Sequence, residues 1–236
     1  MQADKLVADE IQKTISRLYE RINDRFPGAG LARVCQRLHK VSLETDETVR
    51  WIAHPNHWLR AGVAGLIILV TGLLGTSLLQ LKLDTERITL PDFIQMTEAA
   101  VSELVLIGAG IITLITYENR RKRQRVIEAT NRLRSIAHVV DAHQLTKDPD
   151  RLSKIHTLTP HSPSENIDAF GLGRYLDYCS EMLALIGKLG FLFVQDFHDP
   201  VATSAVNDLE NLTTGLSRKI WQKIIILRNQ PIEAEN

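Results

Sequence analysis

The sequence predicts an all-α integral membrane protein with a two-span transmembrane helical hairpin and a cytoplasmic helical bundle formed by its N- and C-terminal helices. Three observations predict this class. Two long apolar runs lie at 61–79 and 99–117, a cluster of basic residues follows the second run, and apolar residues recur at helical spacing elsewhere, without a strand pattern. We expect N-terminal cytoplasmic helices in 1–56, the transmembrane hairpin in 57–119, a C-terminal cytoplasmic helical domain in 120–230 and a tail in 231–236.

Each apolar run is long enough to cross a bilayer. Residues 61–79 are 19 residues without a charge, and at about 1.5 Å per residue they extend roughly 28 Å as a helix, close to the hydrocarbon thickness. The run at 99–117 contains one charge, Glu103, near one end, where a carboxylate can reach the headgroups or a partner. We therefore expect spans at about 59–80 and 97–118, joined by a short external loop.

Charged residues beside the spans predict their orientation. Five basic residues follow the second span, whereas the loop between the spans contributes only Lys82 and Arg87. Because cytoplasmic flanks carry the excess of Lys and Arg, both termini should be cytoplasmic, in a multi-pass protein of the inner or plasma membrane. Trp58 and Tyr117 then lie at the same interface, which amphipathic rings prefer. The basic residues are Arg120, Arg121, Lys122, Arg123 and Arg125.

Apolar stripes predict the remaining helices. One fills 4–26 and stops at Pro27-Gly28; a second covers 31–40 and is followed by a connector over 44–56. The second span should continue as one helix of about fifty residues to residue 146, followed by a loop-rich segment up to residue 171. The last two helices should cover 172–197 and 199–228. The continuation of the second span carries Val126, Leu133, Ile136 and Val140 as its apolar stripe.

Two expectations concern burial in the C-terminal helices. Residues 182–194 are apolar but extend only about 20 Å as a helix and contain Lys188, so we expect a buried bundle helix there and not a third span. In the last helix, which Asp199-Pro200 should cap, Trp221 belongs to a dense apolar patch with Ile224–Leu227. Another helix of the same chain, a neighbouring subunit or the membrane surface could cover this patch, and we expect Trp221 to be buried within the protein.

Composition excludes several classes of function. The formal net charge is zero over 236 residues, so bulk electrostatics does not favour nucleic acid as a partner. Cys35 and Cys179 are predicted on the same side of the membrane and are interpreted as small core residues. The first 30 residues hold no continuous apolar stretch, so we expect no cleaved signal. Without a phosphate-binding glycine loop, CxxC, HExxH or GxSxG, we expect no cofactor and no metal.

Small residues form a helix-packing seam in the predicted spans. Such residues let helix backbones approach closely within lipid. The seam packs the hairpin on itself or forms a subunit interface, and both alternatives stay open. Glu103 could form an acidic ring in an oligomer, but reaching the interface or pairing with Lys82 is the commoner arrangement. The seam consists of Gly65, Gly72 and Thr76 in the first span, with Ala109 and Thr113 in the second.

The basic run after the second span predicts contact with anionic lipid headgroups. Nucleic acid is an unlikely ligand for it, because no aromatic platform lies beside it in the sequence. A role as a positively charged anchor on the cytoplasmic side fully explains the run.

One stretch carries a possible catalytic motif. Arg132 and His138, with five residues between them, resemble the Arg-x4-6-His motif of HEPN ribonucleases, all-helical nucleases that pair two such motifs in a dimer. The resemblance covers only 132–143, and the residue after the arginine, usually polar in that family, is Leu133. Arg151 and His156 fit a similar spacing. His138 could also share a metal or a hydrogen bond with Asp141, three residues on.

The sequence therefore favours a small non-enzymatic membrane module over an enzyme. We expect it to be a homo-oligomer that acts as an anchor, a sensor or a pore-forming or membrane-perturbing component, with a cytoplasmic bundle that binds an unidentified protein or small signal. The alternative is a membrane-tethered helical hydrolase that resembles HEPN ribonucleases and uses Arg132 and His138.

Overall fold

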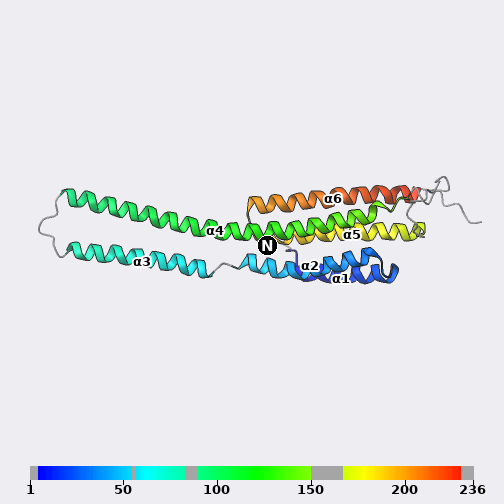
Figure 1. The fold of residues 1–236 in the computed structure, drawn as a ribbon, viewed down its shortest axis with the longest axis horizontal. Coiled ribbons are helices and arrows are strands. Elements are labelled where there is room, and N and C mark those ends of the chain that lie inside the picture. Colours follow the sequence, from blue (N-terminus) through cyan, green and yellow to red (C-terminus); the bar gives the residue numbers. More distant parts are fainter. Residues whose placement is uncertain (1–4, 55–56, 83–89, 150–166, 230–236) are drawn as a thin grey trace, which may run out of the picture. The chain divides into compact units, whose positions relative to one another are not determined.

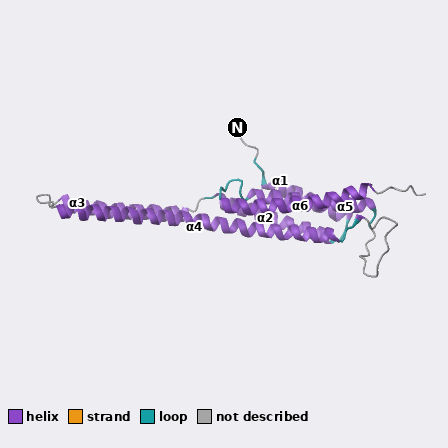
Figure 2. Ribbon diagram, turned by 90° about the horizontal axis from the view of Figure 1, so that it is seen from above, coloured by secondary structure: helices purple, strands orange, loops and turns teal. Residues whose placement is uncertain are grey.

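The computed structural model of the protein describes residues 5–54, 57–82, 90–149 and 167–229, and all regular structure in these ranges is helical (Figures 1 and 2). The chain divides into two compact units. Unit 1 combines residues 1–53 with 123–236, and unit 2 is His54–Lys122. The helices are α1 (Ala8–Arg25), α2 (Gly30–Ala53), α3 (His57–Lys82), α4 (Leu90–Leu145), α5 (Ala169–Leu192) and α6 (Pro200–Asn229). The fold class is thus all-α, as predicted.

Unit 1 is a helical bundle with one continuous core. Helices α1 and α2 pack together, α5 and α6 pack together, and α5 contacts both α1 and α2. The predicted stripe of α1 is buried at Ile11, Ile15, Leu18 and Ile22, which confirms its helical phase. The turn into α2 depends on Gly28, whose φ of 74° lies in the left-handed region that glycine adopts most readily.

Helix α2 is longer than predicted, because the expected connector over 44–56 is largely helical. The helix runs to Ala53 without a break, and Ile52 at its end is buried in the core. Ser42 and Thr45 donate their hydroxyl hydrogens to the carbonyls of His39 and Val41, respectively. Such back-bonding satisfies these side chains within a helix, and no proline lies between Pro27 and Pro55 to interrupt it.

Helices α5 and α6 approach each other closely. A Cβ added at Gly190 would lie 2.7 Å from Leu209 Cδ2, and one at Gly187 would lie 3.4 Å from Thr213 Oγ1. Most of 182–194 is buried, including Met182, Leu183 and Phe193, so the buried bundle helix is confirmed. The glycines of α5 let its backbone come near the side chains of α6.

Both C-terminal helices begin at an aspartate cap. Asp168 accepts the amide hydrogen of Gly171 at the start of α5. Asp199, the predicted cap of α6, accepts those of Val201 and Ala202. These contacts satisfy amide groups that have no partner within the helix.

The structure contradicts the expected burial of Trp221. Its side chain is 56% exposed, whereas Ile220 and Ile224 are buried. Trp221 lies one position further round the helix than the buried Ile220. The inward face of α6 consists of Ala202, Val206, Leu209, Thr213, Leu216, Ile220 and Ile224. Trp221, Ile225 and Ile226 therefore form an exposed apolar patch on α6.

Helix α4 is a single helix of 56 residues. The sequence predicted one continuous helix of about fifty residues here. Its C-terminal part belongs to unit 1, where Val126, Leu133, Ile136 and Val140 are buried. Lys223 of α6 donates to the carbonyls of Gln144 and Lys147 at the end of this helix, at 2.7 and 3.0 Å. A lysine from another helix thus satisfies carbonyls that α4 itself cannot.

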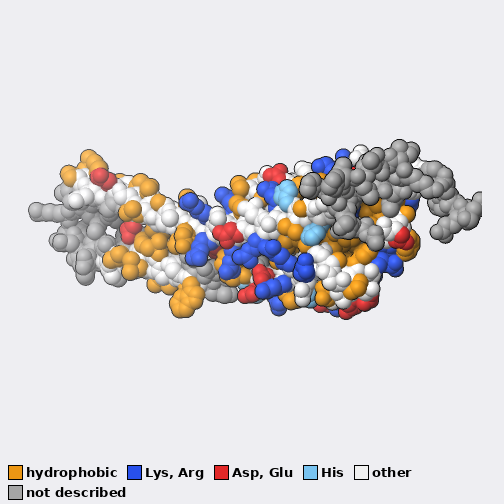
Figure 3. Space-filling model, turned by 45° about the vertical axis from the view of Figure 1, so that its right-hand side comes forward, with side chains coloured by type: hydrophobic (Ala, Val, Ile, Leu, Met, Phe, Trp, Pro, Cys, Tyr) orange, Lys and Arg blue, Asp and Glu red, His pale blue; other side chains and the backbone are white. Residues whose placement is uncertain are grey.

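Unit 2 contains α3 and the N-terminal part of α4. Within the described residues one helix segment, in Phe93–Leu145, is long and apolar enough to cross a membrane, and none of its apolar window is buried. The apolar part of α3 covers Ala61–Leu73 and is shorter. Exposed side chains include Leu104, Val105 and Leu106, between 65% and 72% exposed, and Figure 3 shows hydrophobic side chains (orange) on the surface of unit 2.

Candidate functional site

A hollow surface of unit 1 lies between α2 and α4 and is termed the α2–α4 groove. Three adjoining cavities of about 190, 660 and 290 Å³ make it up. Arg37 and Ile136 line the first two, and Glu44, Glu128 and Arg132 line the last two. The groove is therefore continuous along one face of α2, and α4 forms its other wall.

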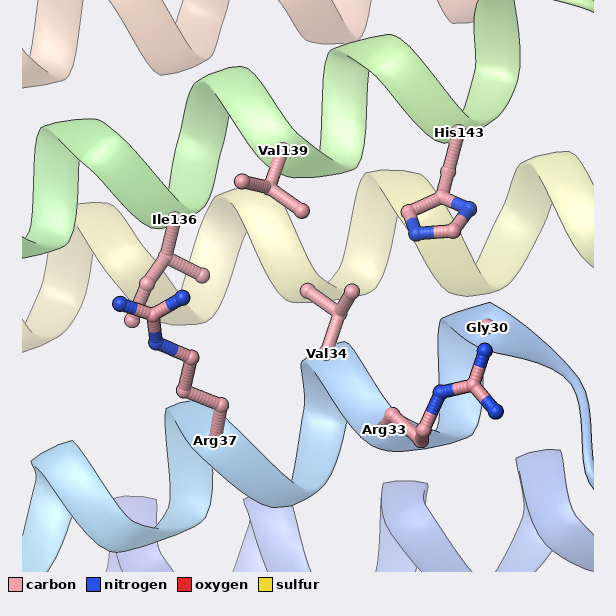
Figure 4. A pocket seen from close by; sticks show the side chains of 7 residues that line it. All are labelled: Gly30, Arg33, Val34, Arg37, Ile136, Val139 and His143. Carbon is pink, nitrogen blue, oxygen red and sulfur yellow. The ribbon is translucent and has the colours of Figure 1, made fainter.

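The first cavity holds most of the uncompensated positive charge and is termed the Arg33/Arg37 cavity. Val34, Ile136 and Val139 supply its apolar lining, and Gly30 and His143 lie at one end (Figure 4). None of the described residues that line it is acidic. Neither guanidinium has an ion pair or hydrogen bond with another described residue, so both can meet an anion.

Gly30 and His143 shape the closed end of this cavity. A Cβ added at Gly30 would lie only 2.4 Å from His143 Cε1, so the imidazole fits there because residue 30 has no side chain. Partial burial, followed by the positive charges of Lys147 and Arg33, lowers the pKa of His143. The imidazole is thus neutral near pH 7 and can both donate and accept a hydrogen bond.

The other two cavities have mixed charge. Arg132 pairs with Glu44 at 3.0 Å across the groove, and both side chains are largely exposed. Glu47 and Glu128 line this part as well, together with Arg125. Anions are therefore less favoured here than in the Arg33/Arg37 cavity, because acidic groups already compensate the cations.

The two residues of the ribonuclease-like motif are not brought together within the chain. Arg132 lines the groove, whereas His138 is exposed and lines none of these three cavities. Six residues along a helix correspond to roughly 240° of rotation, so the two side chains leave α4 in different directions. Asp141 accepts a hydrogen bond from Gln144 at 2.7 Å. The second match to the spacing, Arg151 and His156, lies outside the described residues.

The basic run after the predicted second span makes several defined contacts. Lys122 pairs with Glu118 at 2.9 Å, and the guanidinium of Arg121 lies 5.9 Å from the ring centroid of Tyr117. In unit 1, Arg123 binds Asp199 and the guanidinium of Arg125 stacks over Trp51 at 4.2 Å. Arg123 and Arg125 thus contribute to packing within unit 1. Arg120 and Arg121 are exposed to solvent.

The predicted helix-packing seam is exposed. Gly65 and Gly72 would place an added Cβ in open space, and Ala109 is exposed too. Thr76 and Thr113 are exposed and donate to carbonyls of their own helices. In unit 2 the close approach of α3 and α4 is instead at Leu66 and Gly110, where an added Cβ would lie 3.0 Å from Leu66 Cδ2. Among the glycines described in unit 2, the one that lies against the other helix is thus Gly110, which is outside the predicted seam.

The remaining residues singled out in the sequence are Glu103 and the two cysteines. Glu103 is partly exposed, and the side chain of Lys82, its suggested partner, lies outside the described residues. Cys35 and Cys179 are free and buried, as predicted, and burial raises the pKa of each thiol to about 12. In the described ranges no three His, Cys, Asp or Glu residues come together to hold a metal ion.

Comparison with known proteins adds no family. No protein-family model, curated protein or solved structure matches the chain significantly. The candidate site thus rests on geometry alone. Sequence reasoning missed the Arg33/Arg37 cavity, although the signal was present as two arginines and a glycine at spacings of three and four on one face of α2.

Proposed function

We propose that the protein is a non-enzymatic membrane module, with α3 and the N-terminal part of α4 as its two spans and unit 1 as a cytoplasmic domain that binds a small signal or a partner in the α2–α4 groove. The observation that carries the proposal is that no residue in the apolar window of α4 is buried. A core helix of similar composition would be mostly buried within its own protein.

The free energy of hydration supports a lipid environment for this segment. Burying a Leu or Val side chain stabilises it by about 1.5–3 kcal/mol relative to water. Leu104, Val105 and Leu106 are all largely exposed, and they belong to one continuous run. Exposed apolar surface of this extent is typical of a membrane or protein interface.

The basic run supports an orientation with both termini cytoplasmic, by the excess of positive charge on that side. Arg120 and Arg121 are exposed and suit anionic headgroups. The exposed seam of Gly65, Gly72 and Ala109 supports self-association through close helix packing. In such a homo-oligomer the hairpins anchor a sensor domain, or they perturb or open the membrane.

Cysteine labelling in sealed vesicles tests the topology. The native thiols of Cys35 and Cys179 are buried and have raised pKa values, so they give little background with a membrane-impermeant maleimide. Thr85→Cys, in the predicted external loop, should react from outside. Ser217→Cys, on α6, should react only after the vesicles are opened.

Labelling of Ser217→Cys from outside would overturn the orientation, and recovery of the protein in the soluble fraction would overturn membrane insertion. The hydrolase alternative is tested on the same preparation by RNA cleavage. We expect none above background, and no difference between the wild type and His138→Ala. Cleavage that His138→Ala abolishes would replace the proposed function with a ribonuclease.

A further inference from the structure

We propose that the Arg33/Arg37 cavity binds a small organic dianion, in which two carboxylate groups are held at the ends of a short apolar body, one by each arginine. The inference rests on the proposed function, because it names the chemical class of the signal that the cytoplasmic domain would bind in the α2–α4 groove. Four features of the cavity lead to it.

The first feature is the separation of the two guanidinium groups. Arg33 and Arg37 stand four residues apart on α2, which corresponds to a rise of about 6 Å along the helix. In Figure 4 their guanidinium groups lie on either side of Val34, that of Arg37 near Ile136 and that of Arg33 near Gly30. Two separate anionic groups match this arrangement better than one compact anion.

The second feature is the apolar lining between the two charges. Val34 of α2 faces Val139 of α4 between the arginines, and Ile136 adjoins them (Figure 4). A methylene chain or small ring removes water from this surface, which a fully hydrated ion cannot do. The body of the ligand should therefore be apolar.

The third feature is the charge balance. Among the described residues, neither guanidinium has an ion-pair partner and no carboxylate lines the cavity, so the two arginines give it two positive charges. The adjoining cavity contains two carboxylates, those of Glu44 and Glu128, and Glu44 pairs with Arg132. Guanidinium binds carboxylate through two parallel hydrogen bonds, so each arginine can hold one carboxylate of the dianion.

The fourth feature limits the size and character of the ligand. The cavity of about 190 Å³ is smaller than the roughly 300–1,000 Å³ of sites for drug-sized molecules. Its end is closed by His143, whose neutral imidazole can share a hydrogen bond with one carboxylate without adding a third charge. A dicarboxylate with a short chain, such as glutarate or adipate, fits these limits.

Isothermal titration calorimetry on the full-length protein in detergent tests the proposal. Glutarate and adipate are the probes, and butyrate and inorganic phosphate are the comparison ligands. We expect saturable binding of at least one dicarboxylate, with butyrate and phosphate each about tenfold weaker or more, because each lacks one of the two separated anionic groups. Arg33→Gln and Arg37→Gln should each weaken dicarboxylate binding by about tenfold or more.

Lys40→Gln is the matched control, since it removes one positive charge from the same helix but lines only the adjoining cavity. It should bind the dicarboxylate like the wild type. Gly30→Ala should abolish binding by forcing the imidazole of His143 from its place. Gly30→Ala with His143→Ala should restore the space and part of the affinity, which separates closure of the cavity from misfolding.

The proposal is overturned if neither dicarboxylate binds, if the two Arg→Gln variants bind like the wild type, or if phosphate binds as tightly as the dicarboxylates. Loss of affinity in Lys40→Gln equal to that in Arg37→Gln would also overturn it, since binding would then reflect general positive charge. The topology labelling is independent of these measurements. A correctly oriented membrane protein that binds no dicarboxylate would thus refute the ligand class and leave the proposed function intact.

Discussion

The guanidinium of Arg123 donates three hydrogen bonds to the carboxylate of Asp199, from Nε to both oxygens at 2.9 and 3.0 Å and from Nη2 to one oxygen at 2.7 Å. The same carboxylate accepts the amide hydrogens of Val201 and Ala202. One aspartate therefore caps α6 and connects it to α4 within unit 1. The hydrogen bonds from Arg123, more than those from the backbone amides, lower the pKa of Asp199.

Acid should weaken the contribution of Asp199. A carboxyl group whose pKa is depressed by folding stabilises the native state fully above its unfolded pKa of about 3.9, and this contribution is lost as the pH falls through the folded value. Asp199→Asn keeps a capping oxygen but removes the charge. The melting temperatures of the wild type and Asp199→Asn should therefore differ at pH 7 and converge toward pH 3.

Asp199→Ala completes this comparison, because it removes both the charge and the helix cap. Loss of the cap alone should lower the free energy of unfolding by about 0.5–2 kcal/mol. Equal melting temperatures for Asp199→Asn and the wild type at pH 7 would show that the ion pair does not stabilise the fold. Thermal denaturation followed by circular dichroism, on detergent-solubilised protein, measures all three.

Close packing between α5 and α6 makes Gly190 sensitive to enlargement. Gly190→Ala places a methyl group 2.7 Å from Leu209 Cδ2, and Leu209 is fully buried. Overpacking of this kind costs about 1–3 kcal/mol. Gly215→Ala is the matched control: it also lies within a helix, on α6, but its added methyl group meets nothing within 4 Å. It should stabilise the protein by about 0.5–1 kcal/mol.

Chemical denaturation of the two glycine variants gives the free energies of unfolding. Gly190→Ala should lower the free energy of unfolding, and Gly215→Ala should raise it. If Gly190→Ala were as stable as the wild type, Leu209 would have room to rotate away, and the contact between the two helices would be looser than the structure shows.

Trp221 should be dispensable for the stability of the isolated chain. Because its side chain is 56% exposed, Trp221→Ala should change the free energy of unfolding by no more than about 0.5 kcal/mol. Ile220→Ala, one residue earlier and fully buried, should cost about 2–5 kcal/mol. Thermal denaturation at several protein concentrations measures both, and a concentration-dependent loss in Trp221→Ala would place the residue at a subunit interface.

The stripe of α1 shows why much of the fold could be predicted from the sequence. Ile11, Ile15, Leu18 and Ile22 are separated by one helical turn, and such local spacing decides which face is buried, whatever packs against it. The stripe on α4, with Leu133 and Val140 fully buried, follows the same rule. These predictions needed only neighbouring residues.

Trp221 shows where that approach fails. Two apolar faces are contiguous on α6, and hydrophobicity alone does not say which one meets α5; the close contacts of Leu209 and Thr213 with glycines of α5 decide it. The Arg33/Arg37 cavity could not be predicted from the sequence for a related reason. Its walls come from Gly30–Arg37 and Ile136–His143, about a hundred residues apart, and nothing local connects them.

The arrangement of unit 1 along the sequence means that its N-terminal helices are synthesised well before the helices that cover them. Residues 1–53 and the helices α5 and α6 share one core, but about 115 residues separate Ala53 from Ala169. At roughly 5–20 residues per second, a ribosome needs on the order of 6–23 s to make that interval. During this delay Ile15, Leu18 and Leu38 have no α5 to cover them. The nascent α1–α2 pair must wait with its apolar face uncovered, so a chaperone that shields it until α5 emerges would raise the yield of native protein.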